Sequence, residues 1–334
     1  MNIIDIPNGV EATVAVYRDH KLPEYNTNPM IQALPHLMTE DEFLESVIVM
    51  PNFSPEEKFL KPHLRTHCVE RLSRYFDPIN KTTQLHQAIS VLLMQGYIAR
   101  NILKPQYARR ANQIYQAIQD KGGKTIENYV DVPTSASGFT FIGPSGMGKT
   151  TNLKNILDLY PQVIVHPEHN GAYQIVWIKI DCPHAGSLKG LCIDVFKEID
   201  RLLGTNYFKK FGSTRNSEDY MLAQVAQVAH THHLGMLVID EMQNLVNARR
   251  SKDDLLNFLV KMDNIIGVPV IRVGTNEAYP ILQGNFRNAR RGTGEGGVLW
   301  DRMKQEDEDE WDEWKFFVEG MWKYQWTAEY TVLT

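Results

Sequence analysis

One glycine-rich stretch constrains this chain more than any other. Residues 143–150 read Gly-Pro-Ser-Gly-Met-Gly-Lys-Thr and directly follow the apolar run 139–142. The pattern is typical of a phosphate-binding loop, in which a strand precedes the glycines and a helix follows them. We expect Gly143, Gly146 and Gly148 to adopt positive φ and bring backbone N–H groups close to the α- and β-phosphates of a nucleotide. The predicted nucleotide-binding residues are Gly143, Pro144, Ser145, Gly146, Met147, Gly148, Lys149, Thr150 and Thr151.

The last polar residues of this loop predict the cofactors. Lys149 is expected to reach the β- and γ-phosphates as a point charge, and the Thr150 hydroxyl to bind Mg²⁺. The alternative is a glycine-rich loop that only turns the chain. The motif between strand and helix favours the phosphate role, so ATP and Mg²⁺ are the predicted cofactors.

A second set of polar residues follows two later apolar runs. Asp240 and Glu241 end the run 236–239, and Thr275 and Asn276 follow the predicted strand 269–274. We expect Asp240 to hold Mg²⁺ and Glu241 to polarise the attacking water. Thr275 or Asn276 is expected to sense the γ-phosphate, with helix N-capping as the alternative. An acidic pair alone is often only a surface loop, but with the phosphate loop it predicts a hydrolytic site.

An arginine cluster follows at Arg287, Arg290 and Arg291. The planar guanidinium stabilises spread phosphoryl charge, so one of these residues is a candidate arginine finger. A solvated basic turn is the alternative. A finger that acts on the nucleotide of a neighbouring subunit requires a homo-oligomer.

The order of short apolar runs and helical patterns predicts the fold class. Predicted strands lie at 138–142, 174–180, 234–239 and 269–274, and predicted helices at 149–159, 187–203, 217–233 and 253–266. Such alternation indicates an α/β fold with a parallel sheet covered on both faces. One predicted strand intervenes between the two polar motifs, and a glutamate follows the aspartate. Both features favour the additional-strand class of P-loop ATPases.

The rest of the chain divides by composition. Residues 1–80 are rich in proline and predict an extended arm with short helices that contacts partners. Residues 81–127 predict a helical lead-in, with helices over 81–101 and 106–120, and residues 128–334 form the predicted ATPase core. His63, His67 and Cys68 suggest a metal site, but no second ligand pair follows them, so a helix surface is the better interpretation.

Charge and cysteine content exclude several classes of protein. The formal charge of −5 argues against a wholly basic nucleic-acid binder but leaves room for a local basic strip. Four cations of the lead-in, Arg100, Lys104, Arg109 and Arg110, are either a solvated face or a nucleic-acid or nucleotide contact. Three scattered cysteines, no apolar leader and no run of membrane-spanning length predict a cytoplasmic protein without a membrane contact.

At these motifs the chain resembles AAA+ ATPases and, more narrowly, the TnsC/TniB-type ATPase regulators of cut-and-paste transposons. The stretches that carry the resemblance are 28–35, 160–166, 178–182, 186–189, 237–243, 256–259, 265–270 and 286–292. The resemblance implies an AAA+ P-loop core on a five-stranded parallel sheet. It also implies ATP-dependent assembly of a homo-oligomeric ring or helical filament on double-stranded target DNA, where the protein bridges a target-selection protein of the TniQ type and the transposase. ATP hydrolysis then controls disassembly.

The resemblance also implies DNA contacts from loops that line a central channel. On that basis we expect Ser187 and Lys189, at a helix start, and Lys209 and Lys210, in the loop after that helix, to bind DNA phosphates. For each lysine, the alternative is a surface residue that only increases solubility. The family usually continues into a helical lid, whereas here a helix over 308–326 is its only sign, so a short or missing lid is expected. The acidic, tryptophan-rich run 305–314 is either a docking site for a basic partner or a solvated surface.

Two rival functions remain open on the sequence. One is another DNA-associated AAA+ ATPase, such as a replication initiator or helicase loader. The other is a nucleotide-dependent scaffold that scarcely hydrolyses ATP, against which the Asp240–Glu241 pair argues.

Overall fold

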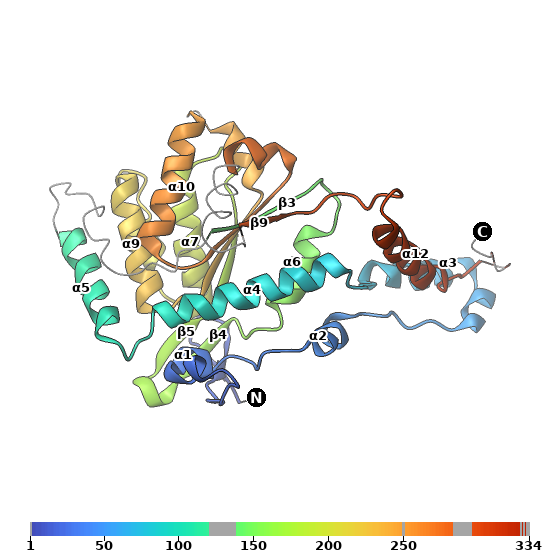
Figure 1. Ribbon diagram of the computed structural model, residues 1–334, viewed down its shortest axis with the longest axis horizontal. Helices are drawn as coiled ribbons and strands as arrows, with labels where there is room; N and C mark the ends of the chain where they lie inside the picture. Colours follow the sequence, from blue (N-terminus) through green and yellow to red (C-terminus); the bar gives the residue numbers. More distant parts are fainter. Residues whose placement is uncertain are drawn as a thin grey trace. The chain divides into compact units, whose positions relative to one another are not determined.

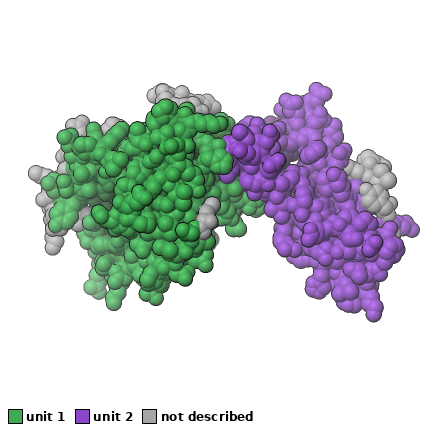
Figure 2. All heavy atoms as spheres, turned by 90° about the horizontal axis from the view of Figure 1, so that it is seen from below, with its two compact units in different colours: residues 1–37, 86–300 green, residues 38–85, 301–334 purple. Residues whose placement is uncertain are grey.

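The computed structural model describes residues 2–119, 138–248, 251–282, 296–327, 329 and 331. Its contacts divide the chain into two compact units, coloured separately in Figure 2. Unit 1 comprises residues 1–37 and 86–300, and unit 2 comprises residues 38–85 and 301–334. None of the described helices is long and apolar enough to cross a membrane.

Unit 1 is built on a five-stranded sheet in which all neighbouring strands are parallel. In spatial order the strands are β6 (Trp177–Asp181), β7 (Met236–Asp240), β8 (Val270–Gly274), β3 (Gly138–Ile142) and β9 (Gly297–Leu299). All five residues of β7 and of β8 are buried, as expected for strands covered on both faces. Strand β8 lies between β3 and β7, so the five-stranded parallel sheet and the additional-strand class are confirmed.

Helices follow most of these strands in the order expected for βαβ units. They are α6 (Lys149–Leu157), α7 (Leu188–Leu203), α8 (Tyr207–Phe211), α9 (Glu218–Thr231) and α10 (Lys252–Ile266). Helices α7, α9 and α10 pack side by side in one layer (Figure 1). Ser187 caps α7 through a bond that its Oγ accepts from the Gly190 N–H at 3.0 Å, as the sequence predicted.

The predicted strand 174–180 is wrong in one respect, because the structure divides it between two sheets. Residues Ala172–Ile175 form β5 in a second sheet, and β6 begins at Trp177. Val176 lies at the crossing point and donates its N–H to the Gln162 carbonyl at 2.9 Å. The second sheet, which the sequence did not predict, has the order β1 (Ile3–Asp5), β2 (Glu11–Val14), β4 (Val163–His166) and β5.

The stretch expected to form one N-terminal arm is shared between the two units. Its first part supplies β1, β2 and α1 (Pro29–Gln32) to unit 1, where Met30 and Ile31 are fully buried. Asn28 fixes this part to α4 (Asn80–Ala99), since its Nδ2 donates to the Tyr97 carbonyl at 2.7 Å. The second part, from residue 38, belongs to unit 2.

Unit 2 combines α2 (Glu40–Val47), α3 (Pro62–Val69), the first turns of α4 and α12 (Glu308–Trp322). Edge-to-face aromatic pairs hold it together. Phe53 packs on Tyr324 and Trp326, with ring centroids 5.6 and 5.2 Å apart, and Tyr75 packs on Phe317 at 5.8 Å. Among the described residues, no cluster of three or more histidines, cysteines or acids could hold a metal.

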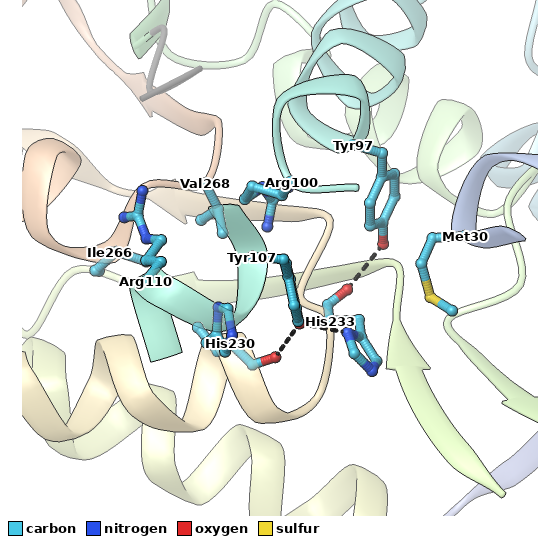
Figure 3. Close-up of a pocket in the computed structure, with 10 residues that line it drawn as sticks. Met30, Tyr97, Arg100, Tyr107, Arg110, His230, His233, Ile266 and Val268 are labelled. Atoms are coloured by element: carbon cyan, nitrogen blue, oxygen red, sulfur yellow. Dashed lines mark hydrogen bonds between the residues drawn. The ribbon is translucent and has the colours of Figure 1, made fainter. Parts of the chain in front are cut away.

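Two of the four cations expected on the surface of the lead-in, Arg100 and Arg110, line a pocket of unit 1, where Arg110 is buried and Arg100 half-buried (Figure 3). Arg100 directly follows α4, and Arg110 lies on α5 (Pro105–Gln119). The Arg100 Nη2 donates to the Gly235 carbonyl at 3.0 Å, and the Arg110 Nη2 donates to the Ile265 carbonyl at 3.2 Å. Burial lowers the pKa of both guanidinium groups.

Backbone carbonyls at the end of α10 and beyond the end of α9 accept the bonds from these arginines. Helix α9 ends at Thr231 and α10 at Ile266, and the carboxyl end of a helix carries partial negative charge. Tyr107, beside the arginines, donates its hydroxyl to the His230 carbonyl at 2.8 Å (Figure 3). The surface interpretation of Arg100 and Arg110 is therefore wrong, and Lys104 and Arg109 alone of the four are exposed.

Candidate functional site

The glycine-rich loop connects β3 to α6, as the sequence predicted. Gly146 and Gly148 have φ of 80° and 74°, a region where a side chain is strained. Gly143 does not have positive φ, so that part of the expectation is wrong. It is required by close packing instead, because a Cβ at Gly143 would stand 2.3 Å from the Trp300 carbonyl oxygen that follows β9.

Lys149 is folded over this loop. Its Nζ donates to the carbonyls of Gly143 at 2.8 Å and Pro144 at 2.7 Å, and its side chain is largely buried. Burial lowers the pKa of Lys149, while the negative charges of Asp240 and Glu241 oppose that change. The ammonium group is thus held at the loop without a carboxylate partner among the described residues.

Thr150 meets the acidic strand end directly. Its Oγ1 donates to Asp240 Oδ2 at 3.1 Å, and the backbone N–H of Glu241 donates to Asp240 Oδ1 at 2.8 Å. Asp240 is 4% exposed, so the carboxylate is nearly removed from water. The two predicted metal ligands, Thr150 and Asp240, are therefore in contact.

Lys179, which the sequence did not single out, lies between two carboxylates. Asp181 and Asp240 are register partners at the carboxyl ends of β6 and β7. The Lys179 Nζ contacts Asp181 Oδ1 at 2.9 Å and Asp240 Oδ2 at 3.1 Å. Burial alone lowers the pKa of Lys179, but the bond to Asp181 and the charge of Asp240 outweigh it and raise the pKa. Lys179 thus neutralises the pair on the side where a metal ion would meet Asp240.

Replacing Lys179 with methionine is expected to lower the Mg²⁺ concentration needed for nucleotide binding. The change removes a positive charge beside Asp240, which would favour a cation there by roughly tenfold, about 1.4 kcal/mol. The unpaired carboxylates should also lower the melting temperature in EDTA. Titration of Mg²⁺ against a bound fluorescent nucleotide, with thermal unfolding in parallel, measures both effects.

Lys261→Met is the matched control for this variant. Lys261 is exposed to the same degree as Lys179, 23% against 25%, and pairs with Asp219 at 2.8 Å on the helical layer. It should leave the Mg²⁺ dependence unchanged. An identical Mg²⁺ titration for Lys179→Met and the parent protein would show that Lys179 does not compete with the metal.

A second chain of contacts joins Glu241 to Thr275. Glu241 has φ of 56°, a strained conformation for a glutamate, and its carboxylate accepts a bond from Gln243 Nε2. The Gln243 Oε1 accepts a bond from the Thr275 N–H at 3.1 Å. The Thr275 Oγ1 is buried and has no hydrogen-bond partner among the described residues. An orphaned hydroxyl of this kind needs an explanation, and a bound phosphate oxygen would provide an acceptor.

These side chains share one pocket. It is lined by residues 145–151 of the loop, Asp240, Glu241, Gln243, Gly274 and Thr275. Positive-φ glycines, a lysine, a hydroxyl–carboxylate pair and an orphaned hydroxyl are the groups that a nucleoside triphosphate with Mg²⁺ requires. The residues fit both groups, with Thr150 and Asp240 at the metal and Lys149 at the phosphates. Asn276, the other candidate sensor, is exposed and does not line the pocket.

Arg287, Arg290 and Arg291 lie outside the described residues. The structure therefore gives no position for the candidate arginine finger.

The four candidate DNA-binding residues lie on α7 and on the short helix that follows it. Ser187 and Lys189 are at its start, and the Lys189 Nζ donates to the Thr214 carbonyl at 3.1 Å. Lys209 and Lys210 are exposed and lie on the short helix α8, not in a loop as expected. Asp200 stabilises the start of that helix, because its carboxylate accepts bonds from the N–H groups of Tyr207 at 2.6 Å and Phe208 at 2.8 Å.

Lys179 and Gln243 are the residues of this pocket region that the sequence reasoning missed. Both had a local signal. Lys179 lies two residues before the strand-end Asp181, and Gln243 lies two residues after Glu241. The sequence alone does not show that β6 and β7 are neighbours in the sheet.

Comparison with known proteins finds one matching family model and several similar solved structures. Residues 134–282 match the family model described as AAA domain. No curated protein sequence matches the chain. Similar solved structures include the ORC2 protein of Aeropyrum pernix, with 13% identity and a TM-score of 0.34 over 66% of this chain and 52% of that chain. Cdc6p of Pyrobaculum aerophilum has 15% identity and a TM-score of 0.34 over 67% and 52%.

A third similar structure is the Aeropyrum pernix ORC1 protein in complex with DNA, with 14% identity and a TM-score of 0.32 over 61% and 46%. The chain spans about half the length of these proteins. The match of residues 134–282 to this family model and the strand order together show that unit 1 has the AAA+ P-loop fold.

Proposed function

We propose that this protein is an ATPase that assembles on double-stranded DNA and regulates DNA transposition. In this role it links a target-selection protein of the TniQ type to a transposase, and ATP hydrolysis controls disassembly. The AAA domain and the pocket geometry support the ATPase part. The transposition part is supported by the sequence resemblance of eight separate stretches, several of which lie outside the nucleotide motifs.

The single observation that carries the ATPase proposal is the contact between Thr150 and Asp240, with Glu241 and Thr275 in the same pocket. Lys149 binds the β- and γ-phosphates and leaves the loop carbonyls it now contacts. Mg²⁺, when bound, neutralises phosphate charge. Water attacks the γ-phosphorus, its proton passes to the Glu241 carboxylate, and the bond to the β–γ bridging oxygen breaks. The Thr275 hydroxyl donates to the γ-phosphate and so distinguishes ATP from ADP.

Assembly follows if an arginine reaches the γ-phosphate of a neighbouring subunit. Arg287, Arg290 and Arg291 are the candidates for that role, and they would make nucleotide binding and homo-oligomer formation depend on each other. The direct test is electron microscopy of the protein with duplex DNA and a non-hydrolysable ATP analogue. Continuous rings or filaments along DNA are expected, whereas isolated monomers under these conditions would contradict the proposal.

DNA binding is proposed for Ser187, Lys189, Lys209 and Lys210. Together they offer the start of α7 with one cation and two further cations on α8, which suits phosphate contacts without base recognition.

The double variant Lys209→Ala, Lys210→Ala is expected to weaken DNA binding equally on unrelated sequences. Both lysines are exposed, and removing two phosphate contacts should make the slope of log K against log salt shallower by roughly 1.8. Fluorescence anisotropy with two unrelated duplexes across a salt titration measures the slope. The double variant Lys21→Ala, Lys252→Ala removes the same charge from exposed positions elsewhere on unit 1 and should keep the parent slope. Equal slopes for both double variants would remove α8 from the DNA site.

The alternative class is a replication initiator or helicase loader, and the same DNA experiment separates it. A transposition regulator of this type coats DNA with little sequence preference. Loading at one origin sequence, with little binding elsewhere, would favour the initiator class.

A further inference from the structure

Helix α12 is an aromatic helix without a fully buried residue. Its fifteen residues, Glu308–Trp322, include three tryptophans and two phenylalanines, yet none of them is buried. It belongs to unit 2 and lies outside the stretch that matches the AAA domain. The proposed ATPase therefore does not account for this helix, and an inference about it is independent of the nucleotide site.

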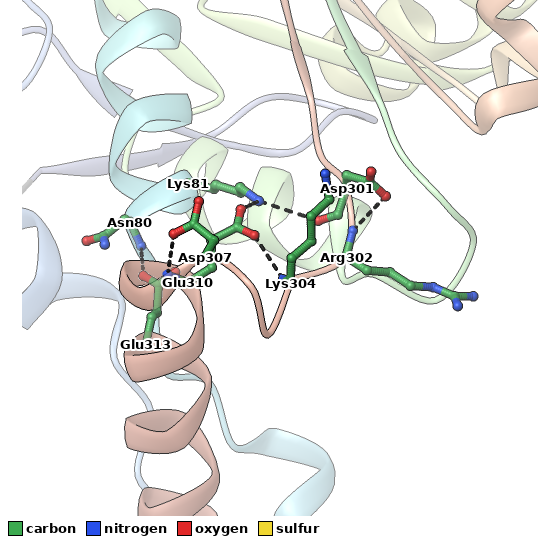
Figure 4. A network of polar contacts seen from close by, with 8 residues as sticks. All are labelled: Asn80, Lys81, Asp301, Arg302, Lys304, Asp307, Glu310 and Glu313. Carbon is green, nitrogen blue, oxygen red and sulfur yellow. Dashed lines mark hydrogen bonds and ion pairs between the residues drawn. The ribbon is translucent and has the colours of Figure 1, made fainter.

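One face of α12 is attached to the first turn of α4 (Figure 4). The Lys81 Nζ contacts Glu310 Oε1 at 2.7 Å, and the backbone N–H of Asn80 donates to Glu313 Oε1. The Lys304 N–H donates to Glu310 Oε2 at 2.9 Å. The bonds from Lys81 and Lys304 lower the pKa of Glu310. Two of the acids of α12 thus have a structural role, and they fix which face of the helix points inward.

The remaining acids of α12 are exposed and form no ion pair with another described element. Glu308, Asp309 and Glu319 form no ion pair with any described residue, and Asp312 pairs only with Lys315 on the same helix, at 2.5 Å. Glu308, Asp312 and Glu319 recur at spacings of four and seven, so they lie along one stripe of the helix. The stripe is exposed and keeps a net negative charge.

Aromatic side chains border the acidic stripe. Phe316 is 71% exposed and follows Asp312 by one helical turn. On the other side, Trp311 and Trp314 stack with ring centroids 4.7 Å apart and planes 6° apart, and Trp314 and Trp322 are both exposed. An ordered tryptophan pair beside carboxylates attracts guanidinium and ammonium groups by both charge and cation–π contact.

The charge of unit 2 excludes nucleic acid as the occupant of this face. Its sequence has 18 acidic and 10 basic residues, a net charge of −8, whereas the remaining 22 acidic and 25 basic residues give unit 1 +3. A phosphate backbone would be repelled, while a basic protein would be attracted. The exposed apolar rings that border the stripe further require a partner that carries apolar side chains between its cations.

We propose that the outer face of α12 docks a basic amphipathic helix of another protein. Its arginines and lysines meet Glu308, Asp309 and Glu319 and lie over the Trp311–Trp314 pair, and its apolar face covers Phe316. A helix suits this face because i, i+3 and i+4 anchors match the spacing of the acids and rings of α12.

The test uses the full chain and a fluorescent 20-residue amphipathic peptide of leucine and arginine, with a leucine–glutamate peptide of the same pattern as the negative probe. The triple variant Glu308→Gln, Asp309→Asn, Glu319→Gln should weaken binding of the arginine peptide at least roughly tenfold at 0.15 M salt. Its matched control is Glu40→Gln, Asp41→Asn, Glu45→Gln. That control removes three exposed acids from α2, two of them again in a first helical turn of unit 2, and the one aromatic residue of α2, Phe43, is buried.

A second pair of variants tests the aromatic part. Phe316→Ala should weaken peptide binding about fivefold, because a desolvated aromatic anchor contributes about 1 kcal/mol or more. Phe59→Ala, which changes a ring 80% exposed elsewhere in unit 2, should have no effect. Equal losses for both acidic triples would show only unspecific charge attraction and overturn the proposal. Unchanged peptide binding in every variant would also overturn the proposal. So would self-association of the full chain that the α12 variants abolish, because the face would then bind a second copy of this chain.

Discussion

Replacing Lys149 with alanine is expected to abolish nucleotide binding and, with it, nucleotide-dependent assembly on DNA. The variant removes the one lysine that lines the described pocket, and loss of a buried charge partner costs about 2–5 kcal/mol, or roughly 30-fold to several thousandfold in affinity. Titration of a fluorescent ATP analogue gives the affinity, and electron microscopy of the same samples with DNA reports assembly. A Lys149→Ala protein that still forms ATP-dependent arrays would refute the proposed coupling.

Lys154→Ala is the control for this variant on the same helix. Lys154 is also on α6 and also carries one positive charge, but its side chain is 71% exposed and its ion pair among the described residues is with Asp158, at 3.4 Å. The Lys154→Ala variant should bind nucleotide as the parent protein does. Since Lys149 also holds the carbonyls of Gly143 and Pro144, thermal unfolding without nucleotide is needed to show that the loop variant is folded.

The phosphate loop could be predicted from sequence because its geometry is encoded within eight consecutive residues. Gly146 and Gly148 have the positive φ that the motif predicts, and helix α6 begins at Lys149. The role of Gly143 could not be predicted in this way. Its requirement comes from the Trp300 carbonyl, more than 150 residues away, beside a strand of only three residues whose pattern is too short to recognise.

The Lys179 contacts could not be predicted from the sequence for a related reason. The sequence predicts that Asp181 and Asp240 each end a strand, but the order of strands in a sheet is a property of the whole fold. Only when β6 lies beside β7 do the two carboxylates become neighbours that need a shared cation. Arg100 and Arg110 were misread because the backbone carbonyls that accept their bonds lie 135 and 155 residues further along the chain.

The sequence predicted α12 as a helix but left its acidic run between two interpretations. Glu310 and Glu313 were indistinguishable from Glu308 and Asp309 in the sequence, and contacts with α4 separate them into structural and exposed acids. The same contacts make the helix part of unit 2, where the sequence had assigned it to the ATPase core.

Replacing Glu241 with glutamine is expected to stop ATP hydrolysis while leaving nucleotide binding in place. The amide keeps the shape of the side chain and can still accept the bond from Gln243, but it cannot take a proton from water. Loss of a general base typically lowers the rate by about 10²–10⁴-fold. The variant should therefore remain assembled on DNA with ATP for longer than the parent protein. Phosphate release and fluorescent-nucleotide titration measure rate and affinity separately.

Glu277→Gln provides the matched control for this variant. Glu277 is exposed, follows β8 by three residues, and does not line the pocket, so the same loss of charge near the site should leave hydrolysis unchanged. The comparison also separates the ATPase from the scaffold interpretation. A parent protein that hydrolyses ATP no faster than Glu241→Gln would be a nucleotide-dependent scaffold. A Glu241→Gln variant within about threefold of an active parent would place the base elsewhere, because such a ratio corresponds to less than 1 kcal/mol. Loss of both binding and hydrolysis would mean instead that Glu241, with its strained φ of 56°, holds the pocket in shape and is not its base.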